Sequence, residues 1–567
     1  MTDPRWIEVL RALEARKLNR RRVVQAGAAA TAVAALPLAR DLAAPRTAAA
    51  APRAQADTSQ LVVLDSLQTQ NWLYMDPGKF YEINPSAALN MLYESLYFIP
   101  DGSKIGEIKP LLATDMPAYS SDGLTATIKI RDGVKFQNSG NPMTADDVVW
   151  SWYRLKNLKG NPSFLFTDFL DSVKAVDPHT VEIKLQSPNA ALPAILSAQM
   201  MGVMDSKAGK ANGGSAEEGA DQSDKLTDWI NKGNSIGTGP YNLTQWDISG
   251  EVILEKNPDY WGDAPKFDRI IFRNVADTST QLQLLETGEA DLAFAVDPDK
   301  ISEVQSNPGL QLLEGPSLAI EYVAMHTHSD VGGPLAKKEA RQAIAHAIDY
   351  DGIINGLLGG HADRPATIAP LGLLGTEDVK GKAYQTDIAK ANELWKSTGA
   401  GTTELSLTYG AGQLTPAGLS RDVLAPKLQQ DIQKIDGVTV KLVPMDSNER
   451  LQMYRDGKLQ FTMSDWSPDY DDVHTYCDPF GHTGGAAAKR VGFSDPAVDK
   501  LLEQGIAELD PAKRKEIYIK IQEALIDAAA FLVEFQPHYL SPAAKTVKGV
   551  QPHGIYILQL RYASKEA

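Results

Sequence analysis

The chain has 567 residues, 43% hydrophobic and 23% charged, which is the composition of a folded protein large enough for several lobes. Its net charge is −16. The first 56 residues carry ten Lys/Arg and four Asp/Glu, so the remainder of the chain carries −22. A surface this acidic repels phosphate backbones and anionic membranes, which argues against a nucleic-acid partner.

Residues 1–56 have the features of an export signal followed by an Ala/Pro-rich tail. Arg20–Arg22 resemble a twin-arginine pattern and precede an apolar run at 23–39, and Ala54–Ala56 offers an A-x-A cleavage site. Cys477 is the only cysteine, so the sequence has no lipobox cysteine near this signal. We expect export to the periplasm or another extracytoplasmic space by the twin-arginine pathway, not as a lipoprotein. The sequence leaves open whether the signal is cleaved or stays as an anchor.

The first part of the remaining chain alternates short strands and helices. The predicted elements are a strand at 61–64, a helix at 91–97, and strands at 125–130 and 180–185. Thr144 and Asp147 form a capping box for a helix that follows them. The stretch 205–237 is rich in Gly, Ser and acidic residues, which predicts a long surface connection.

The second part predicts two βαβ units and several further helices. The elements are a strand at 269–273, a helix at 280–286 and a strand at 290–294, then a strand at 405–409, a helix at 419–435 and a strand at 438–443. Between these units, 339–358 fits two linked helices, with Asp349 available to start the second. Asp510 precedes a proline and is expected to cap a late helix.

The segment 460–480 combines a strand pattern with carboxylates and aromatic rings. Phe461 and Met463 alternate with polar residues up to Trp466, and the pair Ser467-Pro468 ends the strand. The residues expected to share the following loop are Asp465, Asp469, Asp471, Asp472, Asp478, Tyr470 and Tyr476. Such a loop can hold a cation or an ammonium group through charge-assisted hydrogen bonds and cation–π contacts. The alternative is a solvated acidic loop with its tryptophan packed in the core.

Two other patterns suggest different chemistry. Residues 233–237 match G-x-S-x-G, but the helix expected before them and the Gly-Pro turn after them do not fit a hydrolase nucleophile elbow. A metal site is the second possibility, and its ligands would be His474, Cys477 and His482. His326 and His328 alternate as in a strand, which predicts that their rings point apart.

Four segments together resemble one family of proteins. They are IKIRDGVKFQNSGNPMTADDVVWSWYRL at 128–155, GTGPYNLTQWDISGEVILEKNPDYWG at 237–262, QLQLLETGEADLAF at 281–294 and EARQAIAHAIDYDGIINGLLGGHADRP at 339–365. Their order and spacing resemble the extracellular solute-binding proteins, family 5, which serve oligopeptide, dipeptide and nickel ABC importers. The resemblance runs from about Leu61 to the end of the chain.

The resemblance implies an α/β, two-lobed periplasmic-binding-protein (Venus flytrap) fold with an extra domain inserted in the first lobe. The expected boundaries are 57–100, 205–318 and 530–567 for the first lobe, 101–204 for the insert and 319–529 for the second lobe.

The resemblance also implies a ligand site. In peptide-binding relatives an aspartate in a W-x-x-D-Y-like segment pairs with the ammonium group of the peptide, and here that segment contains Trp466, Asp469 and Tyr470. Asp469 is therefore the expected ammonium partner, and Trp466 the ring that covers the ligand. Further expected contacts are Tyr470, Asp471 and Asp472, with Trp72 and Tyr74 from the opposing lobe.

The function implied is that of a monomeric substrate-binding protein of an ABC importer. It would capture a small peptide or similar polar solute and deliver it to a membrane permease, without catalysis and without a cofactor. A metal chelate or an oligosaccharide as ligand remains an alternative in the same transport role, and an exported hydrolase is an alternative of a different class.

Overall fold

The structure, a computed structural model, describes residues 58–102 and 104–566. The predicted export signal and its cleavage site lie outside the described residues. Within this part of the chain, no helix is long and apolar enough to cross a membrane.

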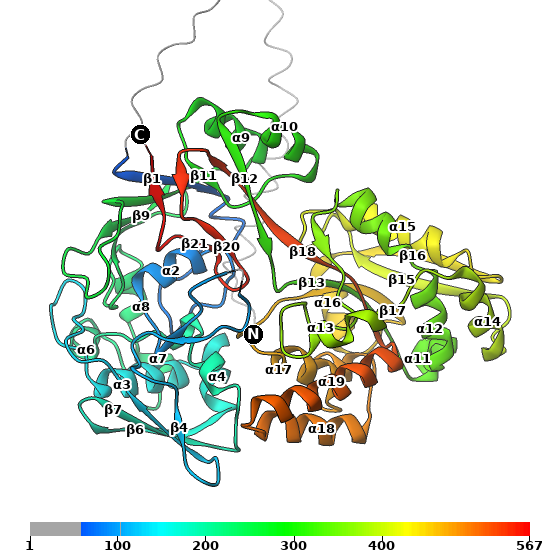
Figure 1. The fold of residues 1–567 in the computed structure, drawn as a ribbon, viewed down its shortest axis with the longest axis horizontal. Coiled ribbons are helices and arrows are strands. Elements are labelled where there is room, and N and C mark those ends of the chain that lie inside the picture. The colour runs from blue at the N-terminus through cyan, green and yellow to red at the C-terminus, as the bar shows by residue number, and fades with distance from the viewer. Residues whose placement is uncertain (1–57, 103, 567) are drawn as a thin grey trace, which may run out of the picture. The chain divides into compact units, whose positions relative to one another are not determined.

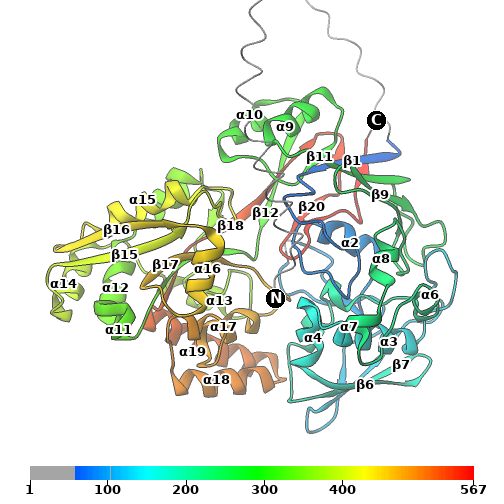
Figure 2. The same cartoon turned by 180° about the vertical axis from the view of Figure 1, so that it is seen from behind.

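A 12-stranded mixed sheet forms the centre of the fold, and strand β18 (Phe531–Ala544) joins its two halves. The first half-sheet consists of β8 (Tyr241–Trp246), β9 (Glu251–Lys256), β10 (Arg269–Asn274), β1 (Gln60–Asp65), β11 (Leu292–Ala293) and β12 (Leu310–Pro316). The second half-sheet consists of β13 (Ile320–Met325), β17 (Phe461–Trp466), β15 (Thr403–Gly410), β16 (Val438–Met445) and β14 (Ala362–Asp363). Both views of the ribbon show β18 running from one half to the other (Figures 1 and 2).

Both predicted βαβ units are confirmed. Strands β10 and β11 lie parallel on either side of β1 and are connected through α9 (Thr278–Thr287), which ends at Gly288 with a left-handed φ of 78°. Strands β15 and β16 pair in parallel and are connected through α15 (Arg421–Ile432). Helices on the sheet faces bury the apolar side chains of these parallel strands.

A second, four-stranded antiparallel sheet lies between β1 and β8 in the sequence. Its strands are β4 (Ala118–Tyr119), β5 (Thr125–Lys129), β7 (Thr180–Leu185) and β6 (Leu170–Asp177), and α3 (Ala145–Asn157) packs against β6 and β7. The predicted capping box is present: the backbone N–H of Thr144 donates to Asp147 Oδ2 at 2.8 Å. The predicted strands of this sheet are confirmed.

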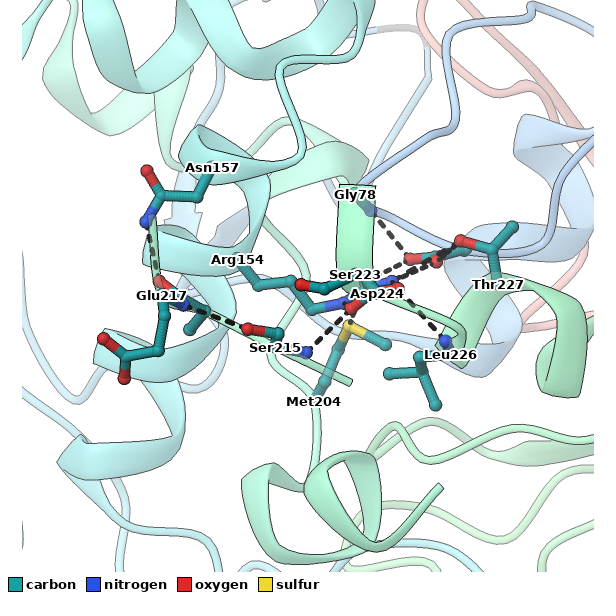
Figure 3. A network of polar contacts seen from close by, with 12 residues as sticks. Gly78, Arg154, Asn157, Met204, Ser215, Glu217, Ser223, Asp224, Leu226 and Thr227 are labelled. Carbon is teal, nitrogen blue, oxygen red and sulfur yellow. Dashed lines mark hydrogen bonds and ion pairs between the residues drawn. The ribbon is translucent and has the colours of Figure 1, made fainter. Parts of the chain in front are cut away.

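The prediction of a surface connection at 205–237 is wrong. This stretch contains α6 (Ser206–Ala211), α7 (Ala220–Ser223) and α8 (Leu226–Ile230), and it supplies Asp224 to a buried ion-pair network (Figure 3). Arg154 of α3 donates to Asp224 Oδ2 at 2.8 Å and to Asp76 Oδ2 at 2.6 Å. The buried carboxylate of Asp224 anchors this segment through its ion pair with Arg154, and few apolar side chains contribute. The low hydrophobicity of the segment therefore did not indicate its helical structure.

The helix predicted at 91–97 lies earlier in the chain. Helix α2 (Ser86–Leu92) begins directly after Pro85, and β2 (Tyr97–Phe98) follows and pairs with β3 (Lys109–Pro110). Glu94, just past the helix, is buried and accepts a hydrogen bond from Arg561 at 2.7 Å. This polar anchor from the end of the chain accounts for an extended backbone where the apolar pattern predicted a helix.

The second half-sheet carries most of the longer helices. They are α12 (Lys338–Ala347), a π-helical segment at Gly352–Leu357, α14 (Ile388–Thr398), α16 (Ser447–Arg455), α17 (His474–Gly481), α18 (Pro496–Ala507) and α19 (Pro511–Ala528). Asp349 accepts from the backbone of Gly352 at 2.9 Å, as expected for a helix restart. Asp510 caps α19 by accepting from the backbone of Ala512 at 2.9 Å, which confirms that prediction.

Short elements complete the described chain. They are α4 (Phe164–Thr167), α5 (Leu192–Ile195), α10 (Ile301–Ser306), α11 (Ser329–Gly332), α13 (Thr376–Val379), β19 (Val547–Lys548), β20 (Gln551–His553), β21 (Ile557–Gln559) and β22 (Ser564–Lys565). Separate apolar clusters form on the two half-sheets; the largest includes β1, α2 and α3 residues.

Candidate ligand-binding site

Strand β17 delivers the predicted acidic segment to the surface of the second half-sheet. It pairs antiparallel with β13 and parallel with β15, and it ends at Trp466, as the Ser467-Pro468 pair predicted. The loop that follows is shorter than expected, because Tyr476 and Asp478 lie in helix α17. The residues left in the loop are 467–473.

Asp469 lies in this loop and contacts a residue from the other part of the molecule. The phenol of Tyr81 donates a hydrogen bond to Asp469 Oδ1 at 2.6 Å, across 388 residues of sequence. Burial raises the pKa of the Asp469 carboxyl, although the hydrogen bond from Tyr81 lowers it. A carboxylate that has lost much of its hydration and has no cationic partner is a strong acceptor for an ammonium group.

Asp469 and Tyr81 line a cavity of about 180 Å³. Segment 80–86 contributes Phe80, Tyr81, Glu82, Ile83 and Ser86 to the lining. The loop after β17 contributes Ser467, Pro468 and Asp469, and the remaining lining residues are Ala198, Gln199, Met200 and Ile555. Ser86 is 1% exposed, and its hydroxyl has no hydrogen-bond partner within the described chain. A buried hydroxyl without a hydrogen-bond partner destabilises the protein, and a ligand in the cavity that bonds to it would remove this cost.

Tyr470 and Asp471 contact Phe169 and Gly106, in the segment predicted as the insert, and do not line this cavity. The ring of Tyr470 packs edge-on against Phe169 at 5.9 Å between centroids. Asp471 accepts a hydrogen bond from the backbone N–H of Gly106 at 2.7 Å, and its other oxygen has no partner among the described residues. Burial raises the pKa of Asp471 to about 7.

Asp472 is held in a bidentate ion pair. Its two oxygens accept from Arg514 of α19 at 2.7 and 2.8 Å, and one of them also accepts from the backbone of His474. Burial opposes ionisation of Asp472, but Arg514 brings its pKa below the usual value. Both oxygens of Asp472 are therefore used in contacts within the protein, which is a structural role.

Besides Tyr470, the other three predicted aromatic contacts also lie apart from the cavity. The Trp466 ring packs edge-on against Phe480 at 5.1 Å, and its indole N–H is buried without a described partner. Trp72 is fully buried and donates to Asp65 Oδ2 at 2.8 Å, so the structure places it in the core of the first half-sheet. Tyr74 is half-buried and is not among the lining residues.

The alternative metal ligands are not assembled as a site. The imidazole Nδ1 of His474 lies 2.8 Å from the hydroxyl of Tyr518, and Cys477 is buried with a thiol pKa raised by desolvation. No group of three His, Cys, Asp or Glu side chains in residues 58–102 and 104–566 is placed to hold a metal ion. The prediction that the rings of His326 and His328 point apart is wrong: they meet edge-on at 5.6 Å, because β13 ends at Met325.

Tyr81, Glu82 and Ser86 were missed by sequence reasoning. They precede or begin α2, in a segment where Asn84-Pro85 marks a break. An aromatic and an acidic residue directly before a helix start were the available signal, but nothing in the sequence pairs them with a loop near position 469.

The comparisons with known proteins agree on one family. The model of the bacterial extracellular solute-binding proteins, family 5 Middle, matches residues 107–488. "Probable D,D-dipeptide-binding periplasmic protein DdpA" of Escherichia coli (strain K12) is 26% identical over 479 residues, covering 84% of this chain and 88% of that protein. Dipeptide-binding protein DppE of Bacillus subtilis (strain 168) is 25% identical over 516 residues, with coverages of 84% and 88%.

Solved structures show the same fold. The substrate-binding protein CtaP of Listeria monocytogenes superposes with a TM-score of 0.76 at 24% identity, covering 89% of this chain and 99% of that chain. The dipeptide-binding protein of Pseudoalteromonas sp. SM9913 in complex with Met-Leu gives 0.70 at 22% identity, with coverages of 89% and 100%. The fold is thus the two-lobed periplasmic-binding-protein fold with an extra domain in the first lobe. Because the family model spans most of the sequence, this chain belongs to the bacterial extracellular solute-binding proteins, family 5, and acts as a solute-binding protein.

Proposed function

We propose that the chain captures a small peptide, or a similar polar solute, in the cavity between segment 80–86 and the loop after β17. The observation that carries this proposal is the contact between Tyr81 and Asp469 across that cavity. The names of the relatives support a peptide ligand, since two of them describe dipeptide-binding proteins. The captured ligand would then be handed to the permease of the importer.

Asp469 is the proposed partner of the ligand's ammonium group. Its carboxylate is partly dehydrated and its Oδ1 is held by Tyr81, so a second acceptor site remains for a donor in the cavity. A charge-assisted hydrogen bond there would stabilise the closed arrangement only when ligand is present, because the ligand bridges both walls. Tyr470, Asp471 and Asp472 would act indirectly, by holding the loop and the contact between lobes.

The lobe boundaries implied by the family resemblance are part of the proposal. We place residues 57–100, 205–318 and 530–567 in the first lobe, 101–204 in the insert and 319–529 in the second lobe. The division at 318 is supported by β12 and β13, which pair with different parts of β18.

Binding without catalysis is the proposed mode of action. The family and the relatives are binding proteins. The serine of the G-x-S-x-G match, Ser235, is fully buried and donates to Gln137 at 2.7 Å, which is unlike an exposed nucleophile. A metal chelate or an oligosaccharide is the alternative ligand class, and no described metal-ligand cluster favours the first.

The proposed location is the periplasm or an equivalent extracytoplasmic space. One relative is named a periplasmic protein, and the arginine-rich start of the sequence supports the twin-arginine route. We further propose that the chain is a monomer without a lipid anchor, and that its acidic charge keeps it from nucleic acid.

Isothermal titration calorimetry of the full chain with short peptides tests the proposal. Asp469→Asn should weaken binding of Ala-Ala-amide by about 100-fold, the effect of a lost charge-assisted bond, with an unchanged melting temperature. The matched control is Asp263→Asn, because Asp263 is exposed and is not among the lining residues. Equal affinity of Asp469→Asn and the wild type would refute the assigned role.

Native mass spectrometry of the protein purified from its own host identifies the ligand class directly. A series of peptide masses would support the peptide ligand. A single sugar or metal-containing mass would retain the transport role and replace the ligand.

A further inference from the structure

The cavity carries negative charge and no described positive charge. Its ionisable lining side chains are Tyr81, Glu82 and Asp469, and no Lys, Arg or His of the described chain lines it. Neither carboxylate has a basic side chain among the groups that act on its pKa. A bound solute therefore meets two carboxylates and no fixed cation.

The two carboxylates accept hydrogen bonds from opposite ends of one tyrosine, Tyr81. The phenol of Tyr81 donates to Asp469 Oδ1 at 2.6 Å, while the backbone N–H of Tyr81 donates to Glu82 Oε2 at 3.0 Å. One acceptor therefore lies at the phenol end of Tyr81 and the other at its backbone end, and both line the same cavity. Two separate carboxylates in one cavity suit a solute with two cationic nitrogens joined by an aliphatic stem, such as the α-amine and ε-amine of one lysine.

The surroundings make each carboxylate costly to leave without a partner. Burial raises the pKa of both Glu82 and Asp469, which reports lost hydration of the ionised form. Ser86 adds an independent sign of a missing ligand, because its hydroxyl is buried beside the cavity with no described partner. A ligand with donors and positive charge satisfies all three groups.

We propose that this site selects solutes with two cationic nitrogens and holds no ligand carboxylate inside the cavity. The inference rests on the proposed function and narrows its substrate class. The shared chemistry has two sources, a peptide with a basic first residue whose chain continues beyond the cavity, and a free aliphatic diamine. A dipeptide with a free carboxylate is disfavoured, because its second charge would face Glu82 without a cation to pair with.

The test compares four probes by calorimetry on the full chain: Lys-Ala-amide, Ala-Ala-amide, Ala-Ala with a free carboxylate, and cadaverine. Lys-Ala-amide should bind at least about tenfold tighter than Ala-Ala-amide, the effect of one added charge-assisted contact. Ala-Ala with its carboxylate should bind more weakly than its amide. Cadaverine binding as tightly as Lys-Ala-amide would identify the diamine source, whereas its failure to bind would identify the peptide source.

Glu82→Gln assigns the second contact. It should reduce the ratio of dissociation constants between Ala-Ala-amide and Lys-Ala-amide to near one, while Glu218→Gln, an exposed glutamate outside the lining, should leave that ratio as in the wild type. If Ala-Ala with a free carboxylate binds as tightly as Lys-Ala-amide, the proposed selection for two cationic nitrogens is overturned, while the proposed capture of peptides stands. Binding of none of the four probes would instead overturn the proposed function itself.

Discussion

At the scale of single residues, Glu534 is the least compensated charge in the described chain's core. It is the extra residue of a bulge in β18, because Glu321 of β13 lies opposite Phe535 while Tyr322 lies opposite Val533. Its side chain is fully buried, and neither oxygen has a described partner. The neighbouring Glu321 forms a bidentate ion pair with Arg421, at 2.7 and 2.8 Å, so this arginine does not pair with Glu534.

Burial and the charge of Glu321 raise the pKa of Glu534 well above its usual value. The folded state therefore holds a proton that the unfolded chain releases near pH 4, so stability falls as pH rises above the unfolded pKa. Glu534→Gln removes the charge and should raise the free energy of unfolding at pH 8 by about 1–3 kcal/mol. Urea unfolding at pH 5 and pH 8 measures this, and a variant equally stable to the wild type at pH 8 would contradict it.

Arg154, in contrast to Glu534, is a buried charged residue whose charge is paired. It contacts Asp76 and Asp224, and all three side chains are at most 2% exposed. Arg154→Met leaves two buried carboxylates without a cation and should cost about 3–5 kcal/mol of stability. Arg269→Met is the matched control, because Arg269 pairs with Glu255 at the surface and its loss should cost less than about 1 kcal/mol.

At the scale of elements, local sequence patterns were sufficient to predict a helix or strand where the residues of that segment alone determine its structure. The βαβ units and the capped helix α19 followed from apolar spacing, Gly288 and Asp510. Elements fixed by distant partners were not predictable: α2 ends where Glu94 meets Arg561, 467 residues away. Half of the candidate site was hidden for the same reason, since Tyr81 and Asp469 share no local pattern.

The cap of α19 gives a prediction at this scale. Asp510 accepts from the backbone of Ala512 and Lys513, which satisfies two N–H groups at the helix start. Asp510→Ala should lower stability by about 1 kcal/mol, and Asp510→Ser should restore most of it. Thermal unfolding followed by circular dichroism compares the three proteins, and an Ala variant with the wild-type melting temperature would show that the cap contributes nothing.

At the scale of the whole described molecule, the inserted region and the second lobe touch outside the cavity. The contacts are the Gly106–Asp471 hydrogen bond, a backbone bond from Ala190 to Ile506 at 2.8 Å, and the rings of Phe169 and Tyr470. In the proposed closure of the lobes, these contacts come from groups that do not line the cavity, so we expect them to influence ligand affinity indirectly.

Asp471 makes that closure dependent on pH. Its pKa is about 7 when the contact is made, and it would return toward the ordinary value near 4 if separation of the lobes exposed it to water. Closure then takes up a proton, so the contribution of Asp471 favours binding at low pH and is lost as pH rises toward 7.

Asp471→Asn retains an acceptor for Gly106 and removes the charge. Its affinity for Lys-Ala-amide should exceed that of the wild type by about tenfold at pH 5 and by about a thousandfold at pH 8, the effect of a pKa that moves from about 4 to about 7 on closure. The change in ratio between the two pH values reports the titration of Asp471, because the substitution removes only that carboxyl group. A constant ratio from pH 5 to pH 8 would rule out this linkage.

Strand β18 also sets the order in which the protein can be made. It begins at Phe531 of a 567-residue chain and pairs with β11, β12 and β13. During synthesis from the N-terminus, those neighbours leave the ribosome with open hydrogen-bonding edges that stay unsatisfied until β18 arrives. The nascent chain must therefore be kept from pairing with other chains until β18 has left the ribosome, and a ribosome that stops shortly before Phe531 releases a product with both half-sheets unfinished.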